Sequence, residues 1–175
     1  MSPLLVLIAA LSLTSGDSTR TAVNSIASNV AASSMTADSI VVDKGNRKLT
    51  LFNRGAVVKT YLVALGANPT GAKVRRGDNR TPEGLYRIEA RNPQSKFYLA
   101  LRVSYPNAED RARAAQLGVD TGGDIMIHGL PRAFAQVGAN HRLDDWTQGC
   151  IALTNQEIEE VYRAVRLGAA ILIKP

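Results

Sequence analysis

The chain has 175 residues, about the length of one domain, and 45% of them are hydrophobic, which is enough for a full core. Its net charge of +6 suits an anionic partner such as a cell wall, a lipid headgroup layer or nucleic acid. Aromatic residues make up only 5% of the chain and no nucleic-acid-binding motif is present, so we expect no nucleic-acid partner. One cysteine excludes an intrachain disulfide. No Cys/His cluster has metal-ligand spacing, so we expect no metal site and no cofactor.

The N-terminus predicts export. Leu4 to Leu13 form an apolar run of about ten residues, too short to span a bilayer, which takes about 20. Small residues follow at Thr14 to Gly16, which is typical of a cleavable signal peptide over residues 1–16. A buried N-terminal helix or strand is the alternative. Residues 17–38 are rich in Ser, Ala, Thr and Asn and are expected to form a flexible lead-in.

From Ser39 the pattern is that of strands. Alternating or β-branched runs predict strands at 40–42, 48–52 and 57–65, joined as an antiparallel meander with a turn at 53–55, and further strands at 85–90 and 97–103. One helix is predicted from an Asn107 cap to Gly118. A second is predicted from Asn155 to about Leu167, ended by Gly168 and followed by a closing strand at 170–173. The expected fold of residues 39–175 is mainly β, an antiparallel sandwich or barrel-like pair of sheets with two or so peripheral helices, as a monomer.

The stretch from Asp124 to Asn155 carries the chemistry. It holds the only cysteine, Cys150, the only tryptophan, Trp146, and both histidines, His128 and His141. His128 ends an apolar run and Cys150 follows a glycine, so both are expected at strand ends. A lone cysteine is most often a small buried residue, and a lone histidine is most often structural. Together, however, the two supply the nucleophile and base of covalent acyl transfer.

These residues resemble a known family. Ile127-His128-Gly129 together with Thr147-Gln148-Gly149-Cys150-Ile151 is similar to the motif of the L,D-transpeptidase catalytic domain (YkuD type). Arg80 to Tyr86 (RTPEGLY) and Val63 to Gly66 (VALG) resemble further segments of that family, over about residues 39–175. The resemblance implies an enzyme that cross-links or edits peptidoglycan through a cysteinyl acyl-enzyme. Two positions depart from the family pattern: Gln148 replaces a common histidine and Ala152 replaces a common arginine.

The expected roles follow from this pairing. Cys150 is the expected nucleophile and His128 the base, with the carbonyl of Gly129 orienting the imidazole, as the resemblance implies. The N–H groups of Gly149 and Cys150 are candidates for an oxyanion hole. Candidate substrate-binding residues are His141, Trp146, Thr147 and Arg80. For three of these a structural role competes: His141 could be a solvated loop residue, Trp146 a packing anchor and Arg80 part of a solvated basic loop.

The function expected from the resemblance is an exported cysteine acyltransferase of the periplasm or cell envelope. It would act on peptidoglycan stem peptides through a Cys150 thioester and form L,D cross-links or attach another amine. No integral membrane span is expected after signal cleavage. The departures at Gln148 and Ala152 motivate an alternative, a murein L,D-amide hydrolase that removes a cross-link or an attached protein. A second alternative is a wall-binding module without turnover.

Overall fold

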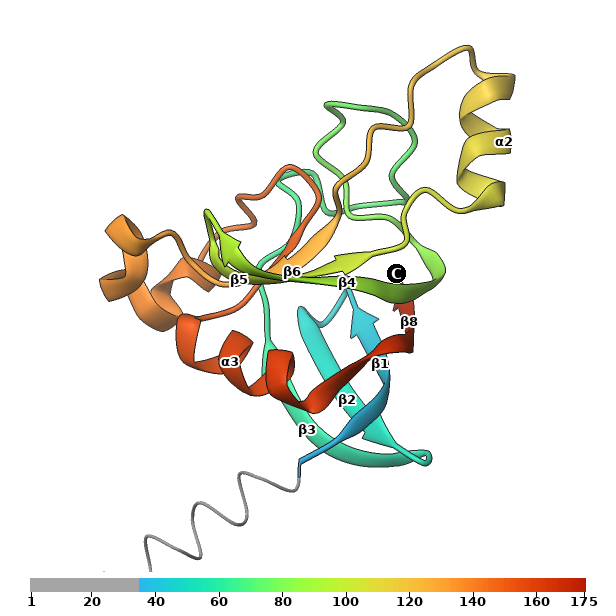
Figure 1. The fold of residues 1–175 in the computed structure, drawn as a ribbon. Coiled ribbons are helices and arrows are strands. Elements are labelled where there is room, and N and C mark those ends of the chain that lie inside the picture. Colours follow the sequence, from blue (N-terminus) through green and yellow to red (C-terminus); the bar gives the residue numbers. More distant parts are fainter. Residues whose placement is uncertain (1–34) are drawn as a thin grey trace, which may run out of the picture. The chain divides into compact units, whose positions relative to one another are not determined.

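The computed structural model describes residues 35–175, which form one curled eight-stranded sheet in the order β3-β2-β1-β8-β4-β5-β6-β7 (Figure 1). The expected signal peptide at 1–16 and nearly all of the lead-in lie outside the described residues. The strands are β1 (Ala37–Asp43), β2 (Lys48–Asn53), β3 (Ala56–Leu62), β4 (Gly84–Ser95), β5 (Tyr98–Val103), β6 (Met126–His128), β7 (Ile151–Ala152) and β8 (Val165–Lys174). The mainly β prediction is confirmed. The sheet begins at Ala37, two residues before the expected domain start.

The first hairpin has the turn that its sequence predicts. Asn53 of β2 pairs with Ala56 of β3, so the loop is Arg54-Gly55, and both residues have positive φ (51° and 81°). This backbone twist matches the twist of the two strands. β3 ends at Leu62, three residues before the expected end. After Leu62 the chain leaves β2 and Ala64 bridges to Ala152, which ties the end of the hairpin to β7.

The first three strands form the expected antiparallel meander, but two other strand pairs are parallel, so the sheet is not antiparallel throughout as expected. β8 lies between β1, to which it is parallel, and β4, to which it is antiparallel. β6 and β7 are the second parallel pair. Two parallel neighbours need a long connection between them. The chain from β1 to β8 includes α3 (Asn155–Ala164), and the chain from β6 to β7 includes the 3-10 segment η1 (Arg132–Arg142). The sequence pattern did not predict η1. Its 3-10 turns are short and are interrupted at Gly138 (φ 52°), so they show no long helical repeat.

Both predicted helices are present. In α2 (Ala108–Gln116), Asn107 accepts from the N–H of Asp110 and Asp110 bonds back to Asn107, which completes a capping box. In α3 the Thr154–Glu157 capping box is also present, but the helix ends at Ala164 and not near Leu167. The reason is that Val165 already pairs with Ala37 of β1, and β-branched valine favours the extended form. Gly168 therefore lies within β8.

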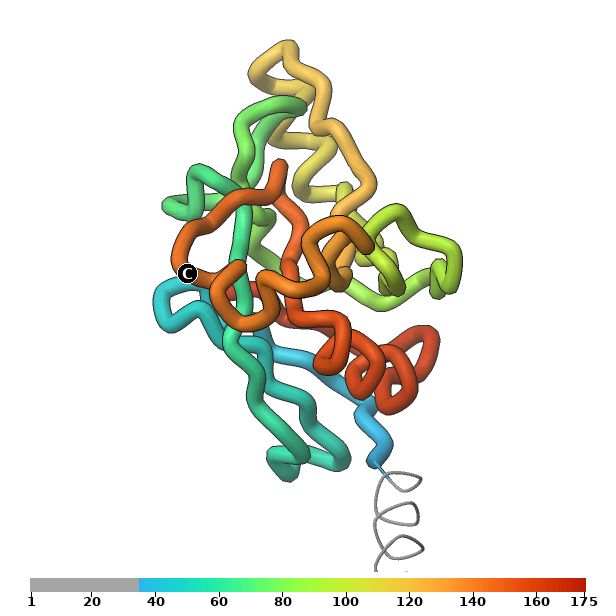
Figure 2. The backbone as a smooth tube through the Cα atoms, turned by 90° about the vertical axis from the view of Figure 1, so that its left-hand side faces the viewer, coloured from blue at the N-terminus to red at the C-terminus, as the bar shows by residue number. Residues whose placement is uncertain are grey.

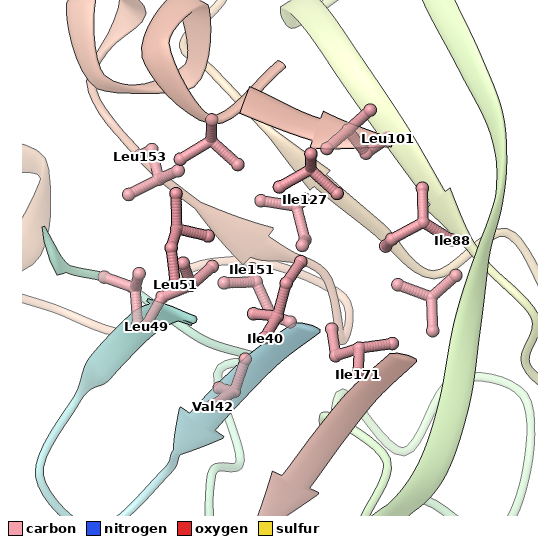
Figure 3. Close-up of a cluster of buried hydrophobic side chains, with 14 of the residues drawn as sticks. Ile40, Val42, Leu49, Leu51, Ile88, Leu101, Ile127, Ile151, Leu153 and Ile171 are labelled. Atoms are coloured by element: carbon pink, nitrogen blue, oxygen red, sulfur yellow. The ribbon is translucent and has the colours of Figure 1, made fainter. Parts of the chain in front are cut away.

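The core lies inside the curl of the sheet, where aliphatic side chains from the strands meet (Figure 3). α3 adds Ile158, Val161 and Ala164 from its buried face. Ile127 of β6 and Ile151 of β7 are both fully buried in this cluster. The core therefore fixes both the strand that carries His128 and the strand that directly follows Cys150. Among residues 35–175, no helix has the length and apolar character needed to cross a membrane.

Candidate active site

The register of β6 and β7 brings the expected nucleophile and base onto one face of the sheet. Ile127 pairs with Ile151, and His128 pairs with Ala152. Alternate residues of a strand share a face, and paired residues of neighbouring strands point the same way. The isoleucines therefore point into the core, whereas His128, Ala152 and the position of Cys150, two residues before Ala152, belong to the opposite face.

His128 is held as a neutral imidazole with one nitrogen engaged. Its Nδ1 lies 2.7 Å from the carbonyl oxygen of Gly129, which can only accept, so Nδ1 carries the proton and Nε2 carries the lone pair. The ring is 2% exposed and packs on Phe97, with the ring centroids 4.4 Å apart, and on the edge of Trp146 at 5.9 Å. Burial lowers the pKa of His128, although the bond to Gly129 opposes the shift. At neutral pH His128 can therefore accept a proton at Nε2.

Gly129 is tightly enclosed. A Cβ at this position would lie 2.5 Å from Oδ1 of Asn155 and 2.9 Å from Cγ2 of Ile158. Oδ1 of Asn155 accepts from the N–H of Leu130 at 2.7 Å, so the first residue of α3 holds the chain just after the histidine. Asn155 was predicted only as a residue of the helix start and was not among the candidate site residues. Its signal was the polar side chain placed directly after the Thr154 cap.

Cys150 is a free thiol whose environment favours the protonated form. Burial raises the pKa of Cys150, and the carboxylate of Asp124 also raises it. The backbone N–H of Met126 and the charge of Lys73 lower it. Sγ lies 3.5 Å from the carbonyl oxygen of Asp124, to which the S–H can donate. With the thiol pKa raised and the imidazole pKa lowered, the resting pair is neutral and needs proton transfer to react.

Thr147 clamps the loop before Cys150. Its hydroxyl donates to the carbonyl of Cys150 at 2.7 Å and accepts the N–H of Gly149 at 3.1 Å. With its side chain 5% exposed and both bonds made, Thr147 supports the loop, and its contact with substrate stays a prediction. The N–H of Gly149 is likewise engaged, so of the two expected oxyanion donors only the N–H of Cys150 is free of a partner within residues 35–175.

The loop is pressed against the segment that follows Asp78. Gly149 has φ 127°, and a Cβ there would lie 2.5 Å from the carbonyl oxygen of Arg80. The Arg80 side chain lines a hollow of about 540 Å³ together with Arg75, and its guanidinium has no acidic partner among the described residues. The neighbouring Lys73 and Asp78 form a buried ion pair at 2.7 Å that braces this segment. The backbone of Arg80 thus packs against the loop of Cys150, whereas its side chain lines a hollow that does not include Cys150.

Trp146 packs on the ring of His128, and His141 packs on Trp146 in turn. Trp146 is 37% exposed, and the edge of His141 meets it at 6.5 Å with the rings nearly perpendicular. Both line an apolar pocket of about 430 Å³ that also includes Phe97. His141 is 7% exposed, so it is not a solvated loop residue. Phe97 was not predicted as a site residue, because a strand pattern does not show which distant histidine an aromatic residue will contact.

No group of three or more His, Cys, Asp or Glu side chains within residues 35–175 is arranged to hold a metal ion. The arrangement itself supplies a thiol, a neutral imidazole and backbone donors. These are the parts of nucleophilic acyl transfer.

Comparisons with known proteins point to a single family. The family model of the L,D-transpeptidase catalytic domain (YkuD) matches residues 37–173. YafK of Escherichia coli strain K12 is 30% identical over 142 residues, which cover 78% of this chain and 50% of YafK. The helical cell shape determining protein Pgp2 of Campylobacter jejuni is 27% identical with a TM-score of 0.61, covering 77% of this chain and 46% of Pgp2. Bd1075 of Bdellovibrio bacteriovorus is also 27% identical, with a TM-score of 0.57, covering 80% of this chain and 48% of Bd1075. The chain thus spans about half the length of these relatives.

Proposed function

Because the chain belongs to the L,D-transpeptidase catalytic-domain (YkuD) family, we propose that it is an exported cysteine acyltransferase acting on peptidoglycan stem peptides through a thioester at Cys150. The observation that carries the proposal is the bond between Nδ1 of His128 and the carbonyl of Gly129, on the strand beside Cys150. It leaves Nε2 as the one basic atom of the ring.

The first step transfers a proton and forms the thioester. Nε2 of His128 accepts the thiol proton as Sγ of Cys150 attacks the amide carbonyl of the stem peptide. The tetrahedral oxyanion is stabilised by the N–H of Cys150. On collapse the C–N bond breaks, and His128 returns the proton to the departing amine.

The second step reverses the first with a new nucleophile. An amine attacks the thioester carbonyl, the C–S bond breaks with its electron pair on sulfur, and the proton of the amine passes through His128 to the thiolate. The product is a new amide. With water in place of the amine, the product is a free carboxylic acid.

The hydrolase alternative stays open because of Ala152. Ala152 is fully buried beside His128, so the family's arginine position offers no side chain to hold a substrate. Other groups must then hold the substrate. Water would outcompete a weakly bound amine in the attack on the thioester. The non-catalytic alternative predicts an unreactive thiol, which the bond between His128 and Gly129 argues against.

The test is incubation of the full chain with purified tetrapeptide muropeptides, followed by mass spectrometry. A cross-linked or amine-exchanged product is expected, and tripeptide product alone would support the hydrolase. Cys150→Ala should give neither product, and His128→Gln should lower the rate about 10²- to 10⁴-fold. Turnover by Cys150→Ala would overturn the proposal, and an inert wild type that binds muropeptides would support the wall-binding module.

Export is the second part of the proposal, and it rests on the apolar run at Leu4 to Leu13. Protein recovered from the cell envelope should lack this run when its N-terminus is sequenced. An intact Met1 on protein from the cytoplasm would contradict it. Pgp2 is a helical cell shape determining protein, and we infer that editing of stem peptides by this chain likewise acts on cell shape.

A further inference from the structure

Two segments that resemble the family take no part in the mechanism above. One is Val63 to Gly66 (VALG), directly after β3, and the other is Arg80 to Tyr86 (RTPEGLY). In the fold the first of them lies beside the loop that precedes Cys150, as the blue-green and orange parts of the tube in Figure 2 show. The groups that fix these segments to the loop therefore bear on the position of the thiol.

Backbone contacts hold Leu65 and Gly66 against the loop. The N–H of Thr147 donates to the carbonyl of Leu65 at 3.0 Å. Gly66 fits closely here, because a Cβ on it would lie 3.1 Å from Cα of Gly149. The N–H of Gly66 in turn donates to the hydroxyl of Thr81 at 3.0 Å. The segment that follows β3 thus supports the loop from Thr147 to Gly149.

The side chain of Asp145 adds a charged contact to this backbone support. Oδ1 accepts the N–H of Leu65 at 2.8 Å. Oδ2 accepts from Nε of Arg47 at 2.9 Å and lies 2.7 Å from Nη2 of the same guanidinium. Charge-assisted hydrogen bonds of this kind are about twice as strong as neutral ones. The side chain of Asp145 is 14% exposed, so salt and water screen its ion pair less than a pair on the open surface.

Arg47 is itself held in the turn between β1 and β2. Its Nη1 donates to the carbonyl of Lys44. Nζ of the buried Lys44 donates to the carbonyl of Thr81 at 3.1 Å and pairs with Glu83 at 2.6 Å. The turn therefore connects Arg47 to the segment of Thr81 and Glu83, and the carboxylate of Asp145 meets a cation that is already fixed.

Asp145 comes directly before the two residues that border the catalytic pair. Trp146 packs on the ring of His128, with the centroids 5.9 Å apart. The hydroxyl of Thr147 donates to the carbonyl of Cys150. A shift of the backbone at Asp145 therefore moves the ring that packs on the base and the hydroxyl that holds the nucleophile's backbone together.

We propose that Asp145 is a positioning residue, whose carboxylate ties the loop before Cys150 to Arg47 and to the backbone of Leu65. It acts through its two neighbours in the chain. The inference rests on the proposed function in that the step that it serves is thioester formation at Cys150. Reacting groups misplaced by about 1 Å can react about 10²-fold more slowly, so a small shift of the loop is enough.

Variants of Asp145 and Arg47 separate the bonds of the carboxylate. Asp145→Ala removes all of them and should slow thioester formation on tetrapeptide muropeptide about tenfold to 10²-fold. KM should stay within about twofold, because no group that binds the peptide is removed. Asp145→Asn keeps an oxygen for the N–H of Leu65 and should recover part of the rate. Arg47→Ala should slow the step less than Asp145→Ala, and combining the two should cost little more, because both act through one contact. Fully additive losses would contradict the proposal.

Two measurements on the resting chain need no turnover. Without the bonds of Asp145 the loop loosens and Cys150 becomes less buried, so alkylation by iodoacetamide should speed up about threefold while thioester formation slows. Trp146, the only tryptophan, should be quenched by acrylamide more readily in Asp145→Ala than in the parent. Slower acyl transfer with unchanged alkylation and quenching would overturn the proposal. If the parent does not acylate at all, the proposed function fails, whereas these two measurements still decide the role of Asp145.

Asp110 on α2 provides the matched control for stability. Its carboxylate likewise accepts one backbone N–H, that of Asn107 at 3.0 Å, and one side-chain donor, the hydroxyl of Tyr86 at 2.9 Å. Asp110→Ala should lower the midpoint of thermal unfolding, yet leave alkylation, quenching and rate as in the parent. Asp144→Ala controls for loss of a charge in the same loop, because Asp144 is exposed.

Equal effects of Asp110→Ala and Asp145→Ala on the folded chains would show that Asp145 only stabilises the fold, and would overturn the proposal. If Asp145→Ala does not fold, Asp145→Asn and Arg47→Ala carry the test with the same expected directions. Wild-type alkylation, quenching and rate in both of these variants would equally refute it.

Discussion

The hydroxyl of Thr147 donates to the carbonyl of Cys150 at 2.7 Å, and this short contact shapes the loop that presents the thiol. The same oxygen accepts the N–H of Gly149. One buried side chain thus satisfies two backbone groups of the loop and fixes the backbone that carries the thiol.

Replacement of Thr147 tests this clamp. Thr147→Val keeps the shape but leaves the carbonyl of Cys150 and the N–H of Gly149 unpaired, so the free energy of unfolding should fall by about 1–3 kcal/mol. The rate of Cys150 acylation should fall with it. Thr147→Ser keeps both bonds and should stay close to the parent. Urea unfolding and reaction with a thioester-forming peptide measure the two effects, and equal behaviour of the two variants would contradict the clamp.

Gly129→Ala should disable the base without unfolding the chain. The added Cβ would meet Oδ1 of Asn155 at 2.5 Å, so the carbonyl that holds Nδ1 of His128 must shift. We expect a loss in rate of about 10²-fold, the lower end of the contribution of a positioned base. Gly123→Ala is the matched control, because a Cβ at Gly123 meets nothing within 4 Å. A normal rate in Gly129→Ala would show that the carbonyl does not position His128.

The pH dependence of Cys150 reactivity follows from the pKa directions. Burial raises the pKa of the thiol, so alkylation by iodoacetamide should increase with pH and reach its midpoint at a higher pH in the folded chain than in urea. The carboxylate of Asp124 contributes to this rise, so Asp124→Asn should lower the midpoint and speed alkylation about twofold at neutral pH. Asp144→Asn should change neither. A lower midpoint in the folded chain than in urea would show that the thiol is activated in the resting state.

Asp78 links stability to pH. Burial alone would raise the pKa of Asp78, but bonds from the N–H groups of Arg75, Val74 and Arg80 and from Lys73 together lower it from 3.8 to about 2. A carboxyl with a lower pKa in the folded chain stabilises above its unfolded pKa and loses that contribution as the pH falls. The contribution should be about 2 kcal/mol at neutral pH and disappear between about pH 4 and pH 2.

The measurement compares urea unfolding of the parent and Asp78→Asn at pH 7 and at decreasing pH. The difference should be large at pH 7, where the variant also leaves Lys73 unpaired, and should shrink toward pH 2. Asp120→Asn is the control, because its carboxylate pairs with the exposed Arg76 at the surface and should matter little. A difference that stays constant with pH would refute the linkage.

The sequence by itself determined most of the strands and the two helix starts, and it singled out two candidate reactive residues. Thr154 with Glu157, and Asn107 with Asp110, are local patterns, and a capping box needs only four neighbouring residues. The Arg54-Gly55 turn is local in the same sense. His128 and Cys150 stood out because each sits next to a glycine at the end of an apolar run, and because the combined motif resembles a known family.

Only the tertiary structure decided which residues meet across long separations. Val165 left α3 early because it pairs with Ala37, more than a hundred residues away, and no local propensity records that competition. The close fit of Gly129 against Asn155, and the engagement of the Gly149 N–H by Thr147, depend on how loops pack. The sequence named His141 only as a candidate, and that its ring is buried beside Trp146 with no hydrogen-bond partner among residues 35–175 is a property of the folded chain.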